Sequence, residues 1–196
     1  MATITFPSTP APSGMTWRLI QPAQNNISGW TGARQVLASG RGWWECSVSL
    51  PPMVGEASVA PWRSFFAKLQ GAANDFRLPV NEIAQSSSTA TPLVNGGSQT
   101  GRSIVTDGWP LSTTVLSAGM YVTINNQLLQ LTADVVSNGS GQATISVAPA
   151  VRTSPADNAP IEFKNPYALM YVLEEPTVSV EPGLVYSTSF SARESF

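Results

Sequence analysis

Alternating hydrophobic and polar residues run through most of the chain and predict short β-strands. The alternation is cleanest over 43–50, where Trp44, Cys46, Val48 and Leu50 fall on one face of an extended segment. Because side chains of a strand point alternately to its two faces, we expect this face to be buried and Cys46 to be a small core residue. Similar patterns predict further strands over 15–20, 34–39, 76–80, 102–106, 121–124, 128–131, 131–136, 143–147, 167–173 and 184–192.

One segment, from about Glu56 or Ser58 to Gln70, has the period of a helix instead. Apolar residues recur there every three or four positions and form one stripe that faces a core. These residues are Val59, Trp62, Phe66 and Leu69, with Phe65 widening the stripe.

The ends of this helix are predicted from its capping residues. Proline is tolerated in the first turn of a helix, so Pro61 places the start near Ser58, which becomes the candidate N-cap. Gly71 is suited to the left-handed position that follows a helix.

Turn-forming residues divide the strands into groups. Residues 81–101 are rich in Ser, Thr and Gly and predict a linker, whereas 21–26 predict a loop. Asn125–Gln127 and Asn138–Gly141 lie between strands and predict hairpin turns, the second being the stronger candidate.

These elements predict a mainly β protein with a discontinuous domain. Two strands near the C-terminus do not make a stable unit alone, so they are expected to return to the sheet of the first section. Residues 1–80 and 164–196 would then form a β-sandwich or split-barrel domain with the helix. Residues 81–163 would form an inserted small β-barrel-like module. Residues 6–14, rich in Pro and Ser, predict an extended arm that lies on a neighbouring molecule in an assembly.

Composition narrows the classes of function. Lys and Arg total 10 against 12 Asp and Glu, and only 11% of residues are charged, which disfavours a duplex nucleic-acid binder. Histidine is absent and Cys46 is the only cysteine, so histidine-based catalysis and His or Cys metal sites are excluded within one chain. No apolar stretch approaches the roughly 20 residues of a membrane span.

No residue pattern points to a catalytic or cofactor site. The glycine-rich stretch 96–101 has no lysine after it, so a solvated linker is favoured over a phosphate loop. Asp107, Asp134 and Asp157 lack the spacing of a calcium loop. We therefore expect a protein that is not an enzyme and binds no cofactor or metal, although a hydrolase using carboxylates alone stays open.

Two groups of aromatic residues are candidates for binding surfaces. Trp and Arg outside a core are favoured at protein interfaces, which makes Trp17, Trp30, Trp43 and Arg41 candidate interface residues. Trp109 and Tyr121 are candidates for a platform that stacks on a sugar. For both groups the alternative is ordinary packing of the core.

Seven motifs follow one another along the chain: 43–53 (WWECSVSLPPM), 60–71 (APWRSFFAKLQG), 74–79 (NDFRLP), 93–96 (LVNG), 101–109 (GRSIVTDGW), 116–124 (LSAGMYVTI) and 152–158 (RTSPADN). Their order resembles that of the distal tail protein family of long-tailed, siphovirus-like bacteriophages and related tail-like particles. The similarity runs from about residue 15 to residue 196.

This resemblance implies a structural role in the virion. Distal tail proteins form a hexameric ring that joins the tail tube to the tail tip or baseplate, and many carry a second β-domain. The resemblance thus implies self-association, contacts with tail tube and tip or hub proteins, and a place in the tail after assembly in the bacterial cytoplasm. The alternative is a carbohydrate-binding module, formed by the inserted segment, that adsorbs to a host surface glycan.

Overall fold

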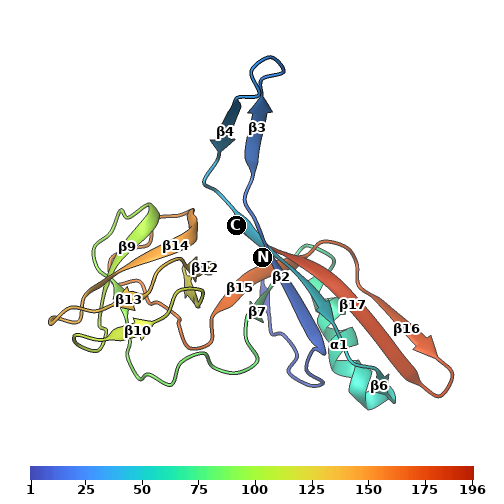
Figure 1. Ribbon diagram of the computed structural model, residues 1–196. Helices are drawn as coiled ribbons and strands as arrows, with labels where there is room; N and C mark the ends of the chain where they lie inside the picture. Colours follow the sequence, from blue (N-terminus) through green and yellow to red (C-terminus); the bar gives the residue numbers. More distant parts are fainter. The chain divides into compact units, whose positions relative to one another are not determined.

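The computed structural model describes residues 1–196. It shows a mainly β protein with seventeen strands and one helix (Figure 1). One of its sheets curls into a half-barrel. The strands are β1 (Thr3–Ile4), β2 (Gly14–Ile20), β3 (Ala23–Ile27), β4 (Arg34–Ala38), β5 (Trp43–Ser49), β6 (Met53–Val54), β7 (Asp75–Pro79), β8 (Leu93–Val94), β9 (Gly101–Asp107), β10 (Thr114–Leu116), β11 (Tyr121–Ile124), β12 (Gln127–Leu131), β13 (Val135–Val136), β14 (Ala143–Val151), β15 (Tyr167–Val172), β16 (Thr177–Glu181) and β17 (Val185–Glu194); the helix is α1 (Glu56–Leu69).

The chain divides into two compact units, each made of separate segments. The first unit contains residues 1–18, 44–79 and 167–196, and the second contains 19–43 and 80–166. Residues 19–43, which the sequence analysis placed with the first section, therefore group with the second unit.

The sheet of the first unit has the strand order β1-β7-β15-β17-β5-β2. Its longest strand, β17, pairs antiparallel with β5 on one side and with β15 and β16 on the other. The strands near the C-terminus thus enter the same sheet as the strands around the helix, which gives the expected discontinuous β-fold with one helix. Strand β16 has no counterpart among the predicted strands.

The alternation predicted over β5 is confirmed by its burial. Trp44, Cys46, Val48 and Leu50 are all buried, and Cys46 lies opposite Ala192 of β17. Burial raises the pKa of the Cys46 thiol to about 12, because the charged thiolate is costly to form away from water. Cys46 is therefore a protonated core residue.

Helix α1 begins at Glu56, the earlier of its two predicted starts. Gly55 occupies the N-cap position and supplies no side-chain cap, while Ser58 lies inside the first turn and its Oγ donates to the carbonyl of Val54. Ser58 is therefore not the N-cap. Pro61 falls in the second turn, where it removes one backbone hydrogen bond. The helix continues past it because its aromatic face is packed.

The buried stripe of α1 differs from the prediction at one residue. Val59, Trp62, Phe65 and Leu69 are buried, whereas Phe66 is only half-buried. The helix ends as expected, since Gly71 has a φ of +67° that favours glycine.

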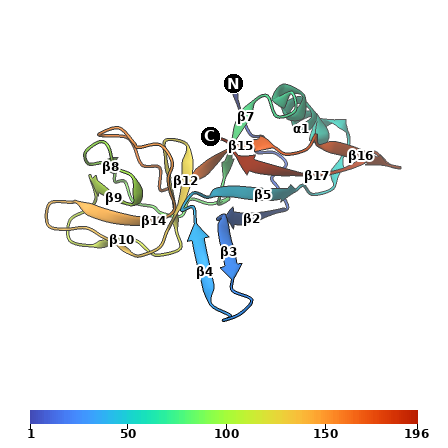
Figure 2. The same cartoon turned by 90° about the horizontal axis from the view of Figure 1, so that it is seen from above.

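Helix α1 lies on one side of the sheet of the first unit (Figure 2). Aromatic rings from four segments form the core between them. The ring of Phe65 lies 5.2 Å from that of Phe76 on β7, and the ring of Trp62 lies 6.3 Å from that of Phe190 on β17. The edge-on and tilted angles of these pairs are those favoured by aromatic quadrupoles. The helix is therefore held to the sheet mainly by aromatic contacts.

The segment expected to be an arm on a neighbouring molecule packs on its own unit instead. The ring of Phe6 lies 5.2 Å from Trp62 and 5.9 Å from Phe76, and β1 pairs parallel with β7. The indole nitrogen of Trp62 also donates to the carbonyl of Pro10 at 3.2 Å. The expectation was wrong because the aromatic helix face offers this segment an apolar surface within the same chain.

The second unit contains a five-stranded sheet in the order β11-β12-β14-β9-β8 and two small two-stranded sheets. Asn125 and Asn126, with φ of +50° and +62°, form the two-residue turn between β11 and β12 as predicted. The core of this unit consists of Val94, Ile104, Trp109, Leu116, Val122, Ile124, Leu129, Leu131, Val135, Ala143, Ile145, Val147, Ala159, Ile161 and Phe163.

The second predicted hairpin of this unit forms only in part. Leu131 lies opposite Val147, and the backbone N–H of Asn138 donates to the carbonyl of Gln142 across the predicted turn. Strand β13, between these two points, pairs with β10 instead of with β14. Ser137, directly after β13, fixes this arrangement because its Oγ contacts the carbonyls of Pro110 and Thr113.

The packing of Phe6 leads to a prediction about stability. We expect Phe6→Ala to lower the free energy of unfolding by about 2 kcal/mol, below the range of about 3–5 kcal/mol for a fully buried Phe, because Phe6 is half-buried. Urea denaturation followed by fluorescence measures this change. Leu184→Ala, at an exposed position of the same unit, serves as the control and is expected to change stability by less than about 0.5 kcal/mol. An equal effect of both variants would contradict the assignment of Phe6 to the core.

Candidate interaction surface

Strands β3 and β4 form a hairpin that belongs to the second unit and has no buried residue. The two strands pair antiparallel over five positions, from Ala23 opposite Ala38 to Ile27 opposite Arg34. Every residue of both strands is exposed, and neither strand pairs with a third (Figure 1). We define residues 23–38 as the β3–β4 hairpin.

The tip of the β3–β4 hairpin is shaped by Ser28 and two glycines. The Ser28 Oγ accepts hydrogen bonds from the backbone N–H groups of Trp30 and Thr31, and the Ser28 carbonyl accepts one from Gly32. Gly32 adopts a φ of +67°, which is strained for other residues. This turn contains Trp30.

At the base of the hairpin, the backbone at Gly42 lies close to Ile20 and Pro149 of the same unit. A side chain at Gly42 would place its Cβ 2.7 Å from the carbonyl oxygen of Ile20 and 3.1 Å from Pro149. The backbone N–H of Ala150 also donates to the carbonyl of Gly40 at 3.4 Å. Glycine is therefore required at position 42.

The β3–β4 hairpin exposes an unusual amount of apolar surface. Trp30 is 99% exposed, Leu37 69% and Ile27 65%. A two-stranded hairpin is marginally stable in water, and exposed apolar patches commonly mark interaction sites. The sequence analysis identified Trp30 but missed Ile27 and Leu37. Residues 21–26 were predicted as a loop because their polar residues give no alternation.

The four predicted interface residues have different surroundings. Arg41 is exposed near the base of the hairpin, and Trp43 is half-buried on the face of β5 opposite Trp44. Trp17, on the edge strand β2, is half-buried, and its ring lies 6.3 Å from that of Trp44. Of these four residues, only Trp30 and Arg41 are therefore exposed.

The predicted sugar platform is not formed by Trp109. This side chain is 4% exposed, its ring lies 5.3 Å from Phe163, and its indole nitrogen donates to Thr106 Oγ1 at 2.7 Å. Tyr121 is half-buried on β11, and burial raises the pKa of its phenol. Stacking on a sugar needs an open aromatic face, so Trp109 is a core residue.

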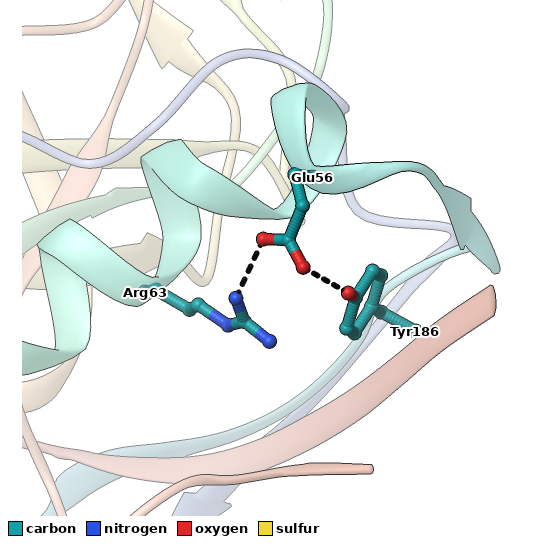
Figure 3. A network of polar contacts seen from close by, with 3 residues as sticks. All are labelled: Glu56, Arg63 and Tyr186. Carbon is teal, nitrogen blue, oxygen red and sulfur yellow. Dashed lines mark hydrogen bonds and ion pairs between the residues drawn. The ribbon is translucent and has the colours of Figure 1, made fainter. Parts of the chain in front are cut away.

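A polar network joins the start of α1 to β17 in the first unit (Figure 3). Glu56 Oε2 accepts a hydrogen bond from Arg63 Nη1 at 2.8 Å, and Glu56 Oε1 accepts one from the Tyr186 hydroxyl. The Arg63 guanidinium lies 4.7 Å from the centre of the Tyr186 ring. The hydrogen bond to Glu56, burial and the negative charge of Glu56 raise the pKa of Tyr186. This network fixes the helix to the sheet.

The carboxylates considered for calcium binding hold loops instead. Asp157 Oδ1 accepts from the backbone N–H of Gly96, and Asp134 Oδ1 accepts from Ala118. No group of three or more His, Cys, Asp or Glu residues is placed to hold a metal ion. An open groove of about 650 Å³ in the first unit, between residues 3–9 and α1, is lined by one cation, Lys68, and by no carboxylate.

No protein-family model matches this chain, and no curated protein matches it. The one helix lacks the length and apolar character that crossing a membrane requires. The β3–β4 hairpin is therefore the surface from which a function is argued.

The Glu56 network predicts a pH dependence of stability. A raised pKa of Tyr186 in the folded state contributes stability that is present below the unfolded pKa of about 10 and is lost as pH rises through the folded value. We expect thermal unfolding between pH 8 and pH 11 to show a fall in stability that is shallower in Tyr186→Phe. The control is Tyr171→Phe, which changes a tyrosine on the neighbouring strand β15. We expect its stability to fall with pH as steeply as that of the unmodified protein.

The burial of Trp109 predicts that its removal affects folding. We expect Trp109→Ala to lower the free energy of unfolding by about 3–5 kcal/mol, because it leaves a cavity and removes the partner of Thr106. Chemical denaturation of dilute protein measures this loss. Trp30→Ala removes an exposed indole and serves as the matched control, with an expected change below about 0.5 kcal/mol. A stable Trp109→Ala variant would show that this indole is not part of the core.

Proposed function

We propose that this protein is a structural subunit of a bacteriophage tail, a distal tail protein whose copies form a hexameric ring. The ring would join the tail tube to the tail tip or baseplate. The subunit would bind further copies of itself, the tail tube protein and the tip or hub proteins. It would be located in the tail of the virion after assembly in the cytoplasm of the bacterial host.

The exposed β3–β4 hairpin is the observation that carries this proposal. The hairpin leaves the side chains of Trp30, which is 99% exposed, Ile27 and Leu37 in water. Apolar surface in water costs free energy, and a cluster of such side chains is typical of an assembly surface. The motif order that resembles distal tail proteins indicates which assembly this is. A β-fold with one helix agrees with the ring-forming domain that the resemblance implies.

The proposed role is one of shape and self-association, without catalysis. The polar network at Glu56 joins two elements of the fold, because it connects the start of α1 to Tyr186 on β17. Binding of a host glycan at Trp109 is not part of the proposal, because a 4% exposed indole has no open face for a sugar ring.

The ring predicts a defined mass in solution. We expect light scattering on a sizing column to give a particle of six times the chain mass of 20.8 kDa, seen as a closed ring by negative-stain microscopy. Trp30→Ala should shift the population to smaller species because it removes an anchor of the contact. Leu111→Ala, which removes an exposed apolar side chain outside the hairpin, should leave the mass unchanged. A protein that is monomeric at all concentrations would contradict the ring.

A further inference from the structure

Charged residues are segregated by sign between two exposed surfaces of the chain. Residues 19–43, which contain the β3–β4 hairpin, include Arg34 and Arg41 and no carboxylate. Both arginines are exposed, and Arg34 uses its Nε–H on Asn25 Oδ1 at 2.7 Å. The hairpin surface is therefore positive as well as apolar.

The opposite sign is found on the segment that contains β16. Residues 165–192 include Glu174, Glu175 and Glu181 and no Lys or Arg. All three carboxylates are exposed, and none forms an ion pair within the chain. We define the acidic edge as residues 173–184, which comprise β16, the turn before it and the turn after it.

The acidic edge also offers a strand edge and apolar side chains. Strand β16 pairs with β17 along one side only, so its other side presents backbone N–H and C=O groups to a further strand. Val180 is 60% exposed on this strand. Strands β3, β4 and β16 are each five residues long, so the hairpin and this edge match in length.

We propose that the β3–β4 hairpin of one copy docks on the acidic edge of the next copy, with Arg34 of the hairpin and Arg41 beside its base facing the three glutamates. This inference rests on the proposed function, because it assigns the contact between neighbouring subunits of the ring. Backbone pairing along β16 and burial of Trp30 supply affinity, and the opposite charges supply orientation.

The contact is heterologous because it joins two different surfaces. Each copy offers its hairpin to one neighbour and receives the hairpin of another at its acidic edge. Repeated contacts of this kind form a ring when the rotation between copies closes. The same chain thus carries both halves of the interface.

Two charge-reversed chains test this contact. The hairpin variant carries Arg34→Glu and Arg41→Glu, and the edge variant carries Glu174→Arg, Glu175→Arg and Glu181→Arg. Each variant alone would bring like charges together at every contact. We expect sedimentation velocity to show at least a tenfold weaker association of each variant than of the unmodified chain.

An equal mixture of the two variants is expected to recover the assembly. In the mixture, every contact between unlike chains again joins opposite charges, and a ring with an even number of subunits accommodates strict alternation. A variant that had merely misfolded would not be rescued by mixing, and circular dichroism of each chain checks this separately. Arg102→Glu and Glu82→Arg, which reverse charges at exposed positions elsewhere, are the controls and should assemble normally.

The outcomes separate this inference from the proposed function. If both variants assemble like the unmodified chain, or if the mixture does not recover assembly, the hairpin-to-edge contact is overturned while the ring stands. If the unmodified chain itself stays monomeric up to its solubility limit, both the ring and this contact are contradicted.

Discussion

Aromatic packing against α1 is the interaction on which the first unit depends. Phe6, Trp62, Phe76 and Phe190 come from an N-terminal segment, the helix and two strands, and their rings converge in one cluster. A cluster of this kind contributes the burial of large apolar surfaces as well as favourable ring geometry. It also explains why α1 accepts Pro61 in its second turn, since the packed face offsets the lost backbone hydrogen bond.

The second unit shows a different balance between packing and hydrogen bonding. Its core is largely aliphatic, and its loops are held by single polar side chains. Gln99 Nε2 donates to the carbonyls of Asn95 and Gly96, and Gln99 Oε1 accepts from the N–H of Val105. The glycine-rich stretch is therefore folded against β9 by one side chain. Trp109 belongs to this core and supports the sheet from within.

The sequence predicted well those elements whose pattern of residues can be recognised within a short segment of the chain. The alternation of β5 and the turn at Asn125 need no distant partner to be recognised, and both are present. The middle of β3, residues 24–26, is polar, and its pairing with β4 is set by the Ser28 turn, so periodicity gave no signal there. Strand β13 pairs with β10 through contacts of Ser137, which periodicity does not reveal. Trp30 was identified as a surface residue from its glycine-rich turn, whereas the acidic edge went unnoticed because β16 itself was missed.

The pairing of β17 has a consequence for the order in which the protein folds. During synthesis, chains generally fold domain by domain from the N-terminal side. All residues of the second unit, ending at 166, precede β15 and β17, so that unit is complete before the first one has its central strand. Until β17 emerges, β5 lacks the strand that pairs with it, and Trp62 of α1 lacks its contact with Phe190. The nascent chain therefore passes through a stage with one folded unit and one exposed apolar surface, and the emergence of β17 ends that exposure.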